Sequence, residues 1–225
     1  MALIEVKNVT KFYNSGEGQV TALGGVNLTV QKGEFLALMG DSGSGKSTLL
    51  SVIGALNPPT GGKVLIDDID VYDLSSERRA DFRSSYIGFV FQQFQLIQYL
   101  TVVENVMVPL AILNYNHKEQ LEMAKKVLRK VGLENKMRRL PNQLSGGEQE
   151  RVAIARAIVN EPPIILADEP TGSLDSKTGE GIMRLFQSLN REGLTIVMVT
   201  HNRENLKFVK RTVSMKDGLI KNQEN

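Results

Sequence analysis

Residues 35–48 read FLALMGDSGSGKST, and this stretch decides how the rest of the chain is interpreted. An apolar run with the length of a buried strand comes first, a glycine-rich run over 40–45 follows, and helical spacing continues over 46–56. The pattern G-x-x-x-x-G-K-[ST] is satisfied at 40–47, in the strand–loop–helix context that gives it meaning. The stretch therefore predicts a phosphate-binding loop; a glycine-rich turn that binds nothing is the alternative.

The residue types of this loop suit a nucleoside triphosphate. Glycine lets backbone N–H groups turn toward phosphate oxygens, and the start of the following helix adds positive potential. We expect Lys46 to reach the β- and γ-phosphates and the Ser47 hydroxyl to bind Mg²⁺. The other candidate phosphate contacts in the loop are Gly40, Ser42, Gly43, Ser44, Gly45 and Thr48.

A pair of acidic residues follows another apolar strand. The run Ile-Ile-Leu-Ala at 164–167 leads directly into Asp168 and Glu169. In parallel sheets the ligand site lies at the carboxyl ends of the strands, so both carboxylates are expected near the phosphate loop. Asp168 suits a Mg²⁺ partner, and Glu169 suits polarisation of an attacking water. The alternative is a strand end followed by an acidic turn without function.

A second anion site is predicted at the start of a helix over 146–159. The sequence Leu-Ser-Gly-Gly-Glu at 144–148 places Ser145, Gly146 and Gly147 where a helix begins with little side chain around its backbone. One protomer has little use for two such sites on one nucleotide. Two protomers packed head to tail would use each site once.

Composition limits the remaining choices. With 225 residues, 41% of them hydrophobic and 23% charged, the chain can bury the core of one large domain and is not disordered. The absence of cysteine excludes a disulfide scaffold and a thiolate nucleophile. A net charge of +2 gives no reason to expect a nucleic-acid partner. With no apolar stretch of membrane-spanning length, we expect a cytoplasmic protein whose membrane role runs through a partner.

Outward from the loop, the chain alternates strands and helices. Strands are expected over 3–9, 20–30, 34–39, 63–67, 86–91, 163–167 and 194–199, with a pair near 212–215 and 219–220. Helices are expected from residue 75 and over 101–113, 117–131, 146–159, 176–191 and 202–209. This pattern predicts one α/β domain over 1–225, with a parallel-sheet core at 1–93 and 142–225 interrupted by a helical subdomain at 94–141.

Taken together, these motifs resemble the ATP-binding cassette (ABC) family over essentially the whole chain. Five family elements appear in order: GDSGSGKST at 40–48, Gln92 after an apolar strand, LSGGE at 144–148, IILADE at 164–169, and His201 after the strand TIVMVT. The resemblance implies a P-loop NTPase core of RecA-like type with a parallel sheet, an N-terminal antiparallel β subdomain and an inserted α-helical subdomain. It implies ATP and Mg²⁺ as cofactors.

The resemblance also assigns roles to single residues. Tyr13 would stack on adenine, with Phe12 as the competing aromatic residue. Gln92 would contact Mg²⁺ or the attacking water, with its neighbour Gln93 as the alternative, and His201 would bond to the γ-phosphate. Further family positions, contributed at the interface with a second subunit, are Ser145, Gly146, Gly147 and Asp175. Glu169, His201, Gln92 and Lys46 then form the catalytic set, and Ser47, Gln92 and Asp168 the metal set.

One residue departs from the family pattern. Asp41 stands where many relatives carry an uncharged residue, and a carboxylate directed at a triphosphate would repel it. We expect its side chain to point to solvent. Because Glu169 and His201 match the family, an active ATPase is expected.

The resemblance further implies partners. A homodimer forms in the ATP-bound state, and a separate membrane permease docks on the helical subdomain and the Gln92 loop, which places the protein on the inner face of the membrane. The runs FVFQQFQLIQYLTVVENVMVPL and TGSLDSKTGE resemble the lipoprotein-releasing, macrolide-export and antimicrobial-peptide-export ATPases. The alternatives are a cell-division-type ATPase, a DNA-acting cassette protein and a nucleotide sensor without turnover. The DNA-acting class is disfavoured because the interval between the phosphate loop and LSGGE is only about 100 residues and contains no sustained heptads.

Overall fold

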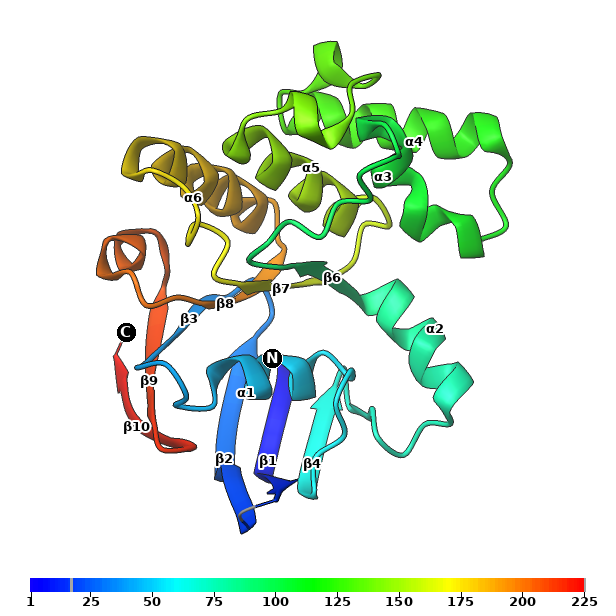
Figure 1. Ribbon diagram of the computed structural model, residues 1–225. Helices are drawn as coiled ribbons and strands as arrows, with labels where there is room; N and C mark the ends of the chain where they lie inside the picture. The colour runs from blue at the N-terminus through cyan, green and yellow to red at the C-terminus, as the bar shows by residue number, and fades with distance from the viewer. Residues whose placement is uncertain (17, 225) are drawn as a thin grey trace.

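The structure is a computed structural model that describes residues 1–16 and 18–224 (Figure 1). Its strands are β1 (Ala2–Ser15), β2 (Gly18–Gln31), β3 (Phe35–Met39), β4 (Gly61–Ile66), β5 (Ile69–Asp70), β6 (Ile87–Val90), β7 (Ile164–Asp168), β8 (Thr195–Val199), β9 (Arg211–Lys216) and β10 (Leu219–Glu224). Its α-helices are α1 (Lys46–Ile53), α2 (Ser76–Tyr86), α3 (Val102–Met107), α4 (His117–Lys130), α5 (Gly146–Ile158) and α6 (Ser176–Arg191). Short 3₁₀ helices are η1 (Val108–Ile112), η2 (Glu134–Lys136), η3 (Pro141–Gln143) and η4 (Arg203–Phe208).

The central sheet has the strand order β10-β9-β3-β8-β7-β6. The strands from β9 to β6 are parallel to one another, and β10 is added antiparallel at one edge. Successive side chains of a strand point to opposite faces. In β3, Phe35 and Ala37 join one buried cluster, whereas Leu36 and Leu38 join another. The sheet is therefore buried on both faces, which explains why its strands read as continuous apolar runs.

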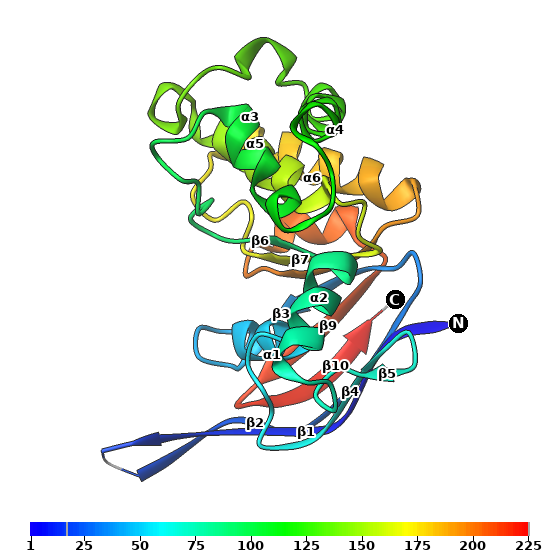
Figure 2. The same cartoon turned by 90° about the vertical axis from the view of Figure 1, so that its right-hand side faces the viewer.

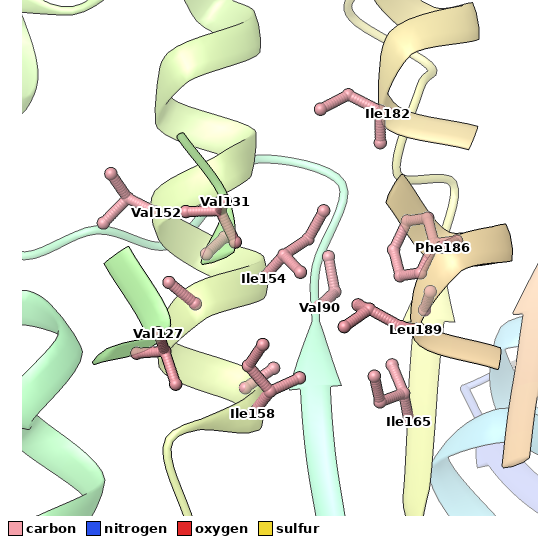
Figure 3. Packing of buried hydrophobic residues seen from close by; sticks show 14 of the residues in the cluster. Val90, Val127, Val131, Val152, Ile154, Ile158, Ile165, Ile182, Phe186 and Leu189 are labelled. Atoms are coloured by element: carbon pink, nitrogen blue, oxygen red, sulfur yellow. The ribbon is translucent and has the colours of Figure 1, made fainter. Parts of the chain in front are cut away.

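One face of this sheet is covered by α5 and α6, with α3 and α4 stacked beyond them (Figures 1 and 2). Burying a side chain such as Ile or Phe stabilises a fold by roughly 1.5–3 kcal/mol. Figure 3 shows the buried residues that join this layer to the sheet: Val90, Val127, Val131, Val152, Ile154, Ile158, Ile165, Ile182, Phe186 and Leu189. This packing fixes the start of α5 relative to the strand ends.

The other face is covered by α1 and by a second sheet. The second sheet is antiparallel, with the order β2-β1-β4-β5 (Figure 2). Its inward residues pack with α1 around Leu49 and Ile53, both fully buried. A backbone hydrogen bond of 3.0 Å from Gly24 N to Gly218 O ties β2 to the β9–β10 hairpin. The two sheets thus enclose α1 and the loop that precedes it.

The expected fold class is confirmed: a parallel-sheet α/β core carries an antiparallel β sheet and additional helices. Two expected helices are different in detail. The helix predicted over 101–113 is α3 followed by the 3₁₀ helix η1, in which Pro109 has no N–H to donate to the carbonyl oxygen four residues earlier, as a continuous α-helix would require. The helix predicted over 202–209 is the 3₁₀ helix η4. The short strand β5 has no counterpart in the sequence prediction.

Across residues 1–16 and 18–224, no helix combines the length and the apolar character needed to cross a lipid bilayer.

Candidate functional site

The phosphate loop connects β3 to α1 and surrounds the positively charged ammonium group of Lys46. The Lys46 side chain turns back over the loop, and its Nζ donates to the carbonyl oxygens of Gly40 (2.8 Å) and Asp41 (2.7 Å). Only 6% of Lys46 is exposed. Asp41 is itself exposed. The loop thus holds a positive charge against its own backbone, where phosphate oxygens can replace the carbonyl partners.

Two glycines of the loop cannot carry a side chain. Gly40 has φ 153°, and a Cβ there would lie 2.2 Å from the carbonyl oxygen of Met215. Gly45 has φ 96°, and its Cβ would lie 2.5 Å from the carbonyl oxygen of Ala22. Gly45 is also the N-cap of α1 and supplies no side-chain cap. The first turn of α1 therefore begins without a side-chain acceptor of its own, as expected where an anion takes that place.

Ser47 and Asp168 meet beside the loop. The Ser47 hydroxyl donates to Oδ1 of Asp168 over 3.1 Å, joining α1 to the end of β7. Burial raises the pKa of Asp168, and the hydrogen bond from Ser47 opposes that effect. Hydroxyl and carboxylate oxygens are the donors that Mg²⁺ prefers, so this pair fits the ion. Within residues 1–16 and 18–224 no three His, Asp or Glu residues gather into a metal cage, so phosphate and water oxygens would complete the coordination.

Glu169 and His201 form a second pair next to the first. Oε2 of Glu169 lies 2.8 Å from Nδ1 of His201, and the Glu169 backbone N–H donates to Val199 O over 3.0 Å. Glu169 has φ 48°, in the left-handed region that residues other than glycine rarely adopt. Its side chain is 19% exposed and that of His201 is 64% exposed. The carboxylate is thus held in place, while the imidazole reaches toward solvent.

Gln92 shares an open cavity with this pair. The cavity measures about 930 Å³, and its lining includes Gly40, Gln92, Glu169 and His201 but not Gln93. A Cβ added at Gly172 would lie 3.3 Å from Oε2 of Glu169 and 3.4 Å from Nε2 of Gln92. The amide and the carboxylate therefore converge on one point, which agrees with the preference for Gln92 over Gln93.

The loop after Gln92 is hydrogen-bonded by Arg156, a residue that sequence reasoning did not identify. From α5, the Arg156 guanidinium donates to the carbonyl oxygens of Gln95 (2.5 Å) and Phe94 (2.7 Å). Phe94 and Gln95 both have positive φ, 58° and 50°. Helical spacing alone makes Arg156 one more polar residue of α5, so only the folded arrangement brings it to the Gln92 loop.

Ser145 and its glycines begin α5. The Ser145 hydroxyl accepts from the Glu148 N–H (3.4 Å), and the Glu148 carboxylate accepts from the Ser145 N–H (2.9 Å), which is a capping box. The hydrogen bond from Lys136 (2.6 Å) lowers the pKa of Glu148. A Cβ at Gly147 would lie 2.3 Å from Cγ2 of Thr178 in α6. The segment LSGGE at 144–148, here called the signature, is therefore a packed helix start as well as a candidate anion site.

Asp175 caps the neighbouring helix. Its carboxylate accepts from the Thr178 N–H over 3.0 Å at the start of α6. The side-chain and backbone hydrogen bonds from Thr178 lower the pKa of Asp175. Ser145 is thus the N-cap residue of α5, and Asp175 is the N-cap residue of the adjacent helix α6.

Tyr13 and Phe12 lie on β1, a strand of the antiparallel sheet. Tyr13 is 42% exposed, and Phe12 is half-buried. The Tyr13 hydroxyl accepts from Nδ2 of Asn57 over 2.5 Å, and the Lys11 ammonium lies 5.2 Å from the centre of the ring. Of the two aromatic residues, Tyr13 offers the more accessible stacking surface.

The candidate residues thus fall into two groups. One group surrounds the phosphate loop at the carboxyl ends of the parallel strands: Gly40, Ser42, Gly43, Ser44, Gly45, Lys46, Ser47, Thr48, Gln92, Asp168, Glu169 and His201. The other group starts α5 and α6, which cover the opposite face of the sheet from α1 (Figure 1). Ser145, Gly146 and Gly147 do not line the cavity of the first group.

Comparisons with known proteins give a consistent result. A family model described as ABC transporter matches residues 23–172. The ABC transporter ATP-binding protein MJ0796 of Methanocaldococcus jannaschii is 51% identical, over 99% of this chain and 97% of the relative. The lipoprotein-releasing system ATP-binding protein LolD of Shewanella frigidimarina is 45% identical, over 97% of this chain and 92% of the relative.

A third relative is longer than this chain. The macrolide export ATP-binding/permease protein MacB of Aggregatibacter actinomycetemcomitans is 44% identical over 98% of this chain, which spans 34% of that relative. The solved dimeric structure of a post-hydrolysis state of the ATP-binding cassette MJ0796, bound to ADP and Pi, superposes with a TM-score of 0.91 at 48% identity. That superposition covers 99% of this chain and 98% of the other.

Proposed function

The chain belongs to the ABC transporter family as a relative of LolD and MacB, and from that premise we propose that it hydrolyses ATP to ADP and phosphate within a head-to-tail homodimer. The observation that carries the proposal is the separation of the two anion sites. The helix α1, which follows the phosphate loop, packs on one face of the central sheet, and α5, which begins after Ser145, packs on the other, so each candidate anion site would be one half of a shared site. Two molecules in opposite orientation would complete two sites.

The residues around the phosphate loop would each take a separate role in ATP hydrolysis. Lys46 and the loop N–H groups would neutralise the phosphates, and Ser47 with Asp168 would hold Mg²⁺. When bound, the ion would draw charge from the phosphate oxygens. Glu169 would polarise the attacking water, and His201 and Gln92 would contact the γ-phosphate and that water. Tyr13 would stack on the adenine, and Ser145, Gly146 and Gly147 of the second molecule would close the site near its Asp175 loop.

Hydrolysis assays test this proposal directly. The rate per molecule should rise with protein concentration, because an isolated molecule lacks half of the site. Glu169→Gln should lower kcat by at least about 100-fold while ATP binding is retained. The control Glu161→Gln, at an exposed carboxylate paired with Lys126, should leave kcat unchanged. A rate per molecule that does not depend on concentration would contradict the shared site.

A groove beside the Gln92 loop supports a membrane permease as the second partner. The groove measures about 530 Å³ and is lined by apolar side chains that reach the surface: Leu56, Phe91, Val108 and Ile112. Ile112 is 72% exposed, and Tyr99, in the segment between Gln92 and α3, is 83% exposed. Leu96, in the loop after Gln92, is buried in the core and is not available for docking. We place the permease contact on this groove and on η1, at the border of the helical subdomain proposed for 94–141.

Substitution in the groove separates docking from catalysis. Ile112→Asp should abolish co-purification with the permease and leave the hydrolysis rate of the isolated protein unchanged, because a charge in an apolar contact is strongly unfavourable. Ile69→Asp, at an exposed apolar residue of β5, is the matched control and should bind normally. Retained binding of Ile112→Asp would move the permease contact elsewhere.

The relatives indicate the class of cargo. We propose export or extraction of a lipoprotein, a peptide or an antibiotic-type molecule, with the protein held peripherally at the inner face of the membrane by its permease. The names of LolD, a lipoprotein-releasing system protein, and of MacB, a macrolide export protein, support the lipoprotein and antibiotic classes. The alternative is a cell-division-type ATPase that regulates a membrane partner without transport. Accumulation of cargo in reconstituted vesicles on addition of MgATP supports transport, and hydrolysis without cargo movement supports the alternative.

A further inference from the structure

Glu169 and His201 contact each other just beyond the ends of β7 and β8, where the two strands are no longer paired in the central sheet. The ladder between β7 and β8 ends with the pairing of Asp168 and Val199, followed by one backbone bond from Glu169 N to Val199 O of 3.0 Å. The two side chains nevertheless lie 2.8 Å apart. A hydrogen bond of this length requires that the segments after both strands be held in a fixed relation.

Asn205 provides such a connection. It lies in η4 and is 4% exposed. Its side-chain Nδ2 donates to Oγ1 of Thr171 and to Oγ1 of Thr200, each over 3.0 Å. Thr171 is two residues beyond Glu169, and Thr200 directly precedes His201. One buried amide therefore joins the segment that carries the carboxylate to the segment that carries the imidazole.

The position of Asn205 is itself fixed. Its backbone N–H donates to Asn202 O (3.2 Å), and the Asn202 N–H donates to Oγ1 of Thr200 (3.1 Å). Thr200 is buried, and its own N–H donates to Leu38 O at the end of β3 (3.1 Å). The amide thus belongs to a network anchored on the strand that leads into the phosphate loop.

The backbone of Glu169 is strained, so contacts are needed to hold its conformation. A left-handed φ of 48° at a non-glycine residue persists only where the surroundings fix it. The Gly172 N–H donates to Glu169 O over 3.0 Å, so Thr171 lies inside the same tight turn. The bond from Asn205 to Thr171 therefore acts on the turn that sets the direction of the Glu169 side chain.

We propose that Asn205 is a positioning residue for the Glu169–His201 pair, which it holds together through Thr171 and Thr200. The proposal rests on the proposed function, in which this pair acts on the nucleotide. Asn190 gives a matched comparison, because it is also buried and donates to two segments, at Gly33 O (3.1 Å) and Leu194 O (2.8 Å). Those contacts lie at the opposite, amino ends of β3 and β8.

The first test observes the pair without nucleotide. The chain has two histidines, so the ring signals of His201 in an NMR spectrum can be assigned against those of His117, which is exposed at the start of α4. In Asn205→Leu, which has a similar shape and no donor, the His201 signals should move and the His117 signals should stay. Asn190→Leu should move neither. Should Asn205→Leu fail to fold, Thr171→Val removes one acceptor only and carries the same expectation.

The second test measures turnover. Asn205→Leu should lower kcat about tenfold with KM for ATP unchanged, because a misplaced catalytic pair costs rate and not binding. Asn205→Leu combined with Thr171→Val should be no slower than Asn205→Leu alone, since both remove the same contact. Unmoved His201 signals and an unchanged kcat would overturn the proposal, as would an equal loss of kcat in Asn190→Leu. If His201 signals move while even the wild type hydrolyses no ATP, the positioning stands and the proposed function fails.

Discussion

At Glu150, a carboxyl group lies in the interior of α5 with neither oxygen hydrogen-bonded by any part of the chain that the structure describes. The residue is fully buried. Burial raises the pKa of Glu150 to about 9, against the opposing effect of the Arg156 charge. Arg156 itself is committed to the carbonyl oxygens of Phe94 and Gln95. Glu150 is therefore protonated in the folded protein at neutral pH.

This protonation predicts a pH-dependent stability. Between about 4.5, the ordinary pKa, and about 9, the folded chain binds one proton more than the unfolded chain. The contribution of Glu150 is fully present below that range and decreases as pH rises, by about 1.4 kcal/mol per pH unit. Glu150→Gln should remove this slope, so its gain in stability over wild type should be larger at pH 8 than at pH 6. Urea unfolding at both pH values measures it.

A control comes from an exposed carboxylate. Lys125 lowers the pKa of Glu122, so Glu122 is ionised in both the folded and the unfolded state at pH 6 and 8, and Glu122→Gln should leave the slope unchanged. An equal stability difference for Glu150→Gln at the two pH values would show that Glu150 is ionised in the fold.

At the scale of elements, α5 and α6 begin so close together that side-chain size is limited. Gly147 in the first turn of α5 faces Thr178 in the first turn of α6. A Cβ at Gly147 would lie 2.3 Å from Cγ2 of Thr178, well inside van der Waals contact. The second glycine of the signature is therefore required by the packing of two helices, independently of any ligand.

Gly147→Ala should consequently destabilise the fold by about 1–3 kcal/mol, the usual cost of overpacking. Thr178→Ser removes Cγ2 and should recover most of that loss in the double variant, as measured by urea unfolding. Equal destabilisation of the single and the double variant would place the cause elsewhere than in this contact.

The elements also show how far sequence reasoning reaches. The helix over 176–191 and the strands around the phosphate loop were predictable, because their periodicity and caps are local. The meeting of Ser47 with Asp168 follows from the convergence of parallel strand ends. The positive φ of Glu169 and the bonds of Asn205 were not predictable, since both depend on tertiary contacts that no sequence spacing encodes. The break of 101–113 has a local cause in Pro109, which the expectation of one continuous helix did not take into account.

At the scale of the whole molecule, the central sheet separates two candidate phosphate contacts. The loop before α1 faces the side of the antiparallel sheet, and the start of α5 belongs to the helical side (Figure 2). Both are attached to the same core, and Ser145, Gly146 and Gly147 do not line the cavity beside the phosphate loop. A partner molecule is the simplest source of the missing contacts, and ATP bound between two molecules would join them.

The molar mass of Glu169→Gln in solution, measured by light scattering with and without MgATP, tests this claim most directly. Because this variant would bind ATP without hydrolysing it, the mass should double to that of two chains only when MgATP is present. Ser145→Arg, which would obstruct the second half-site, should remain a monomer under the same conditions. A variant Glu169→Gln that binds ATP tightly and stays monomeric at high concentration would contradict the shared site.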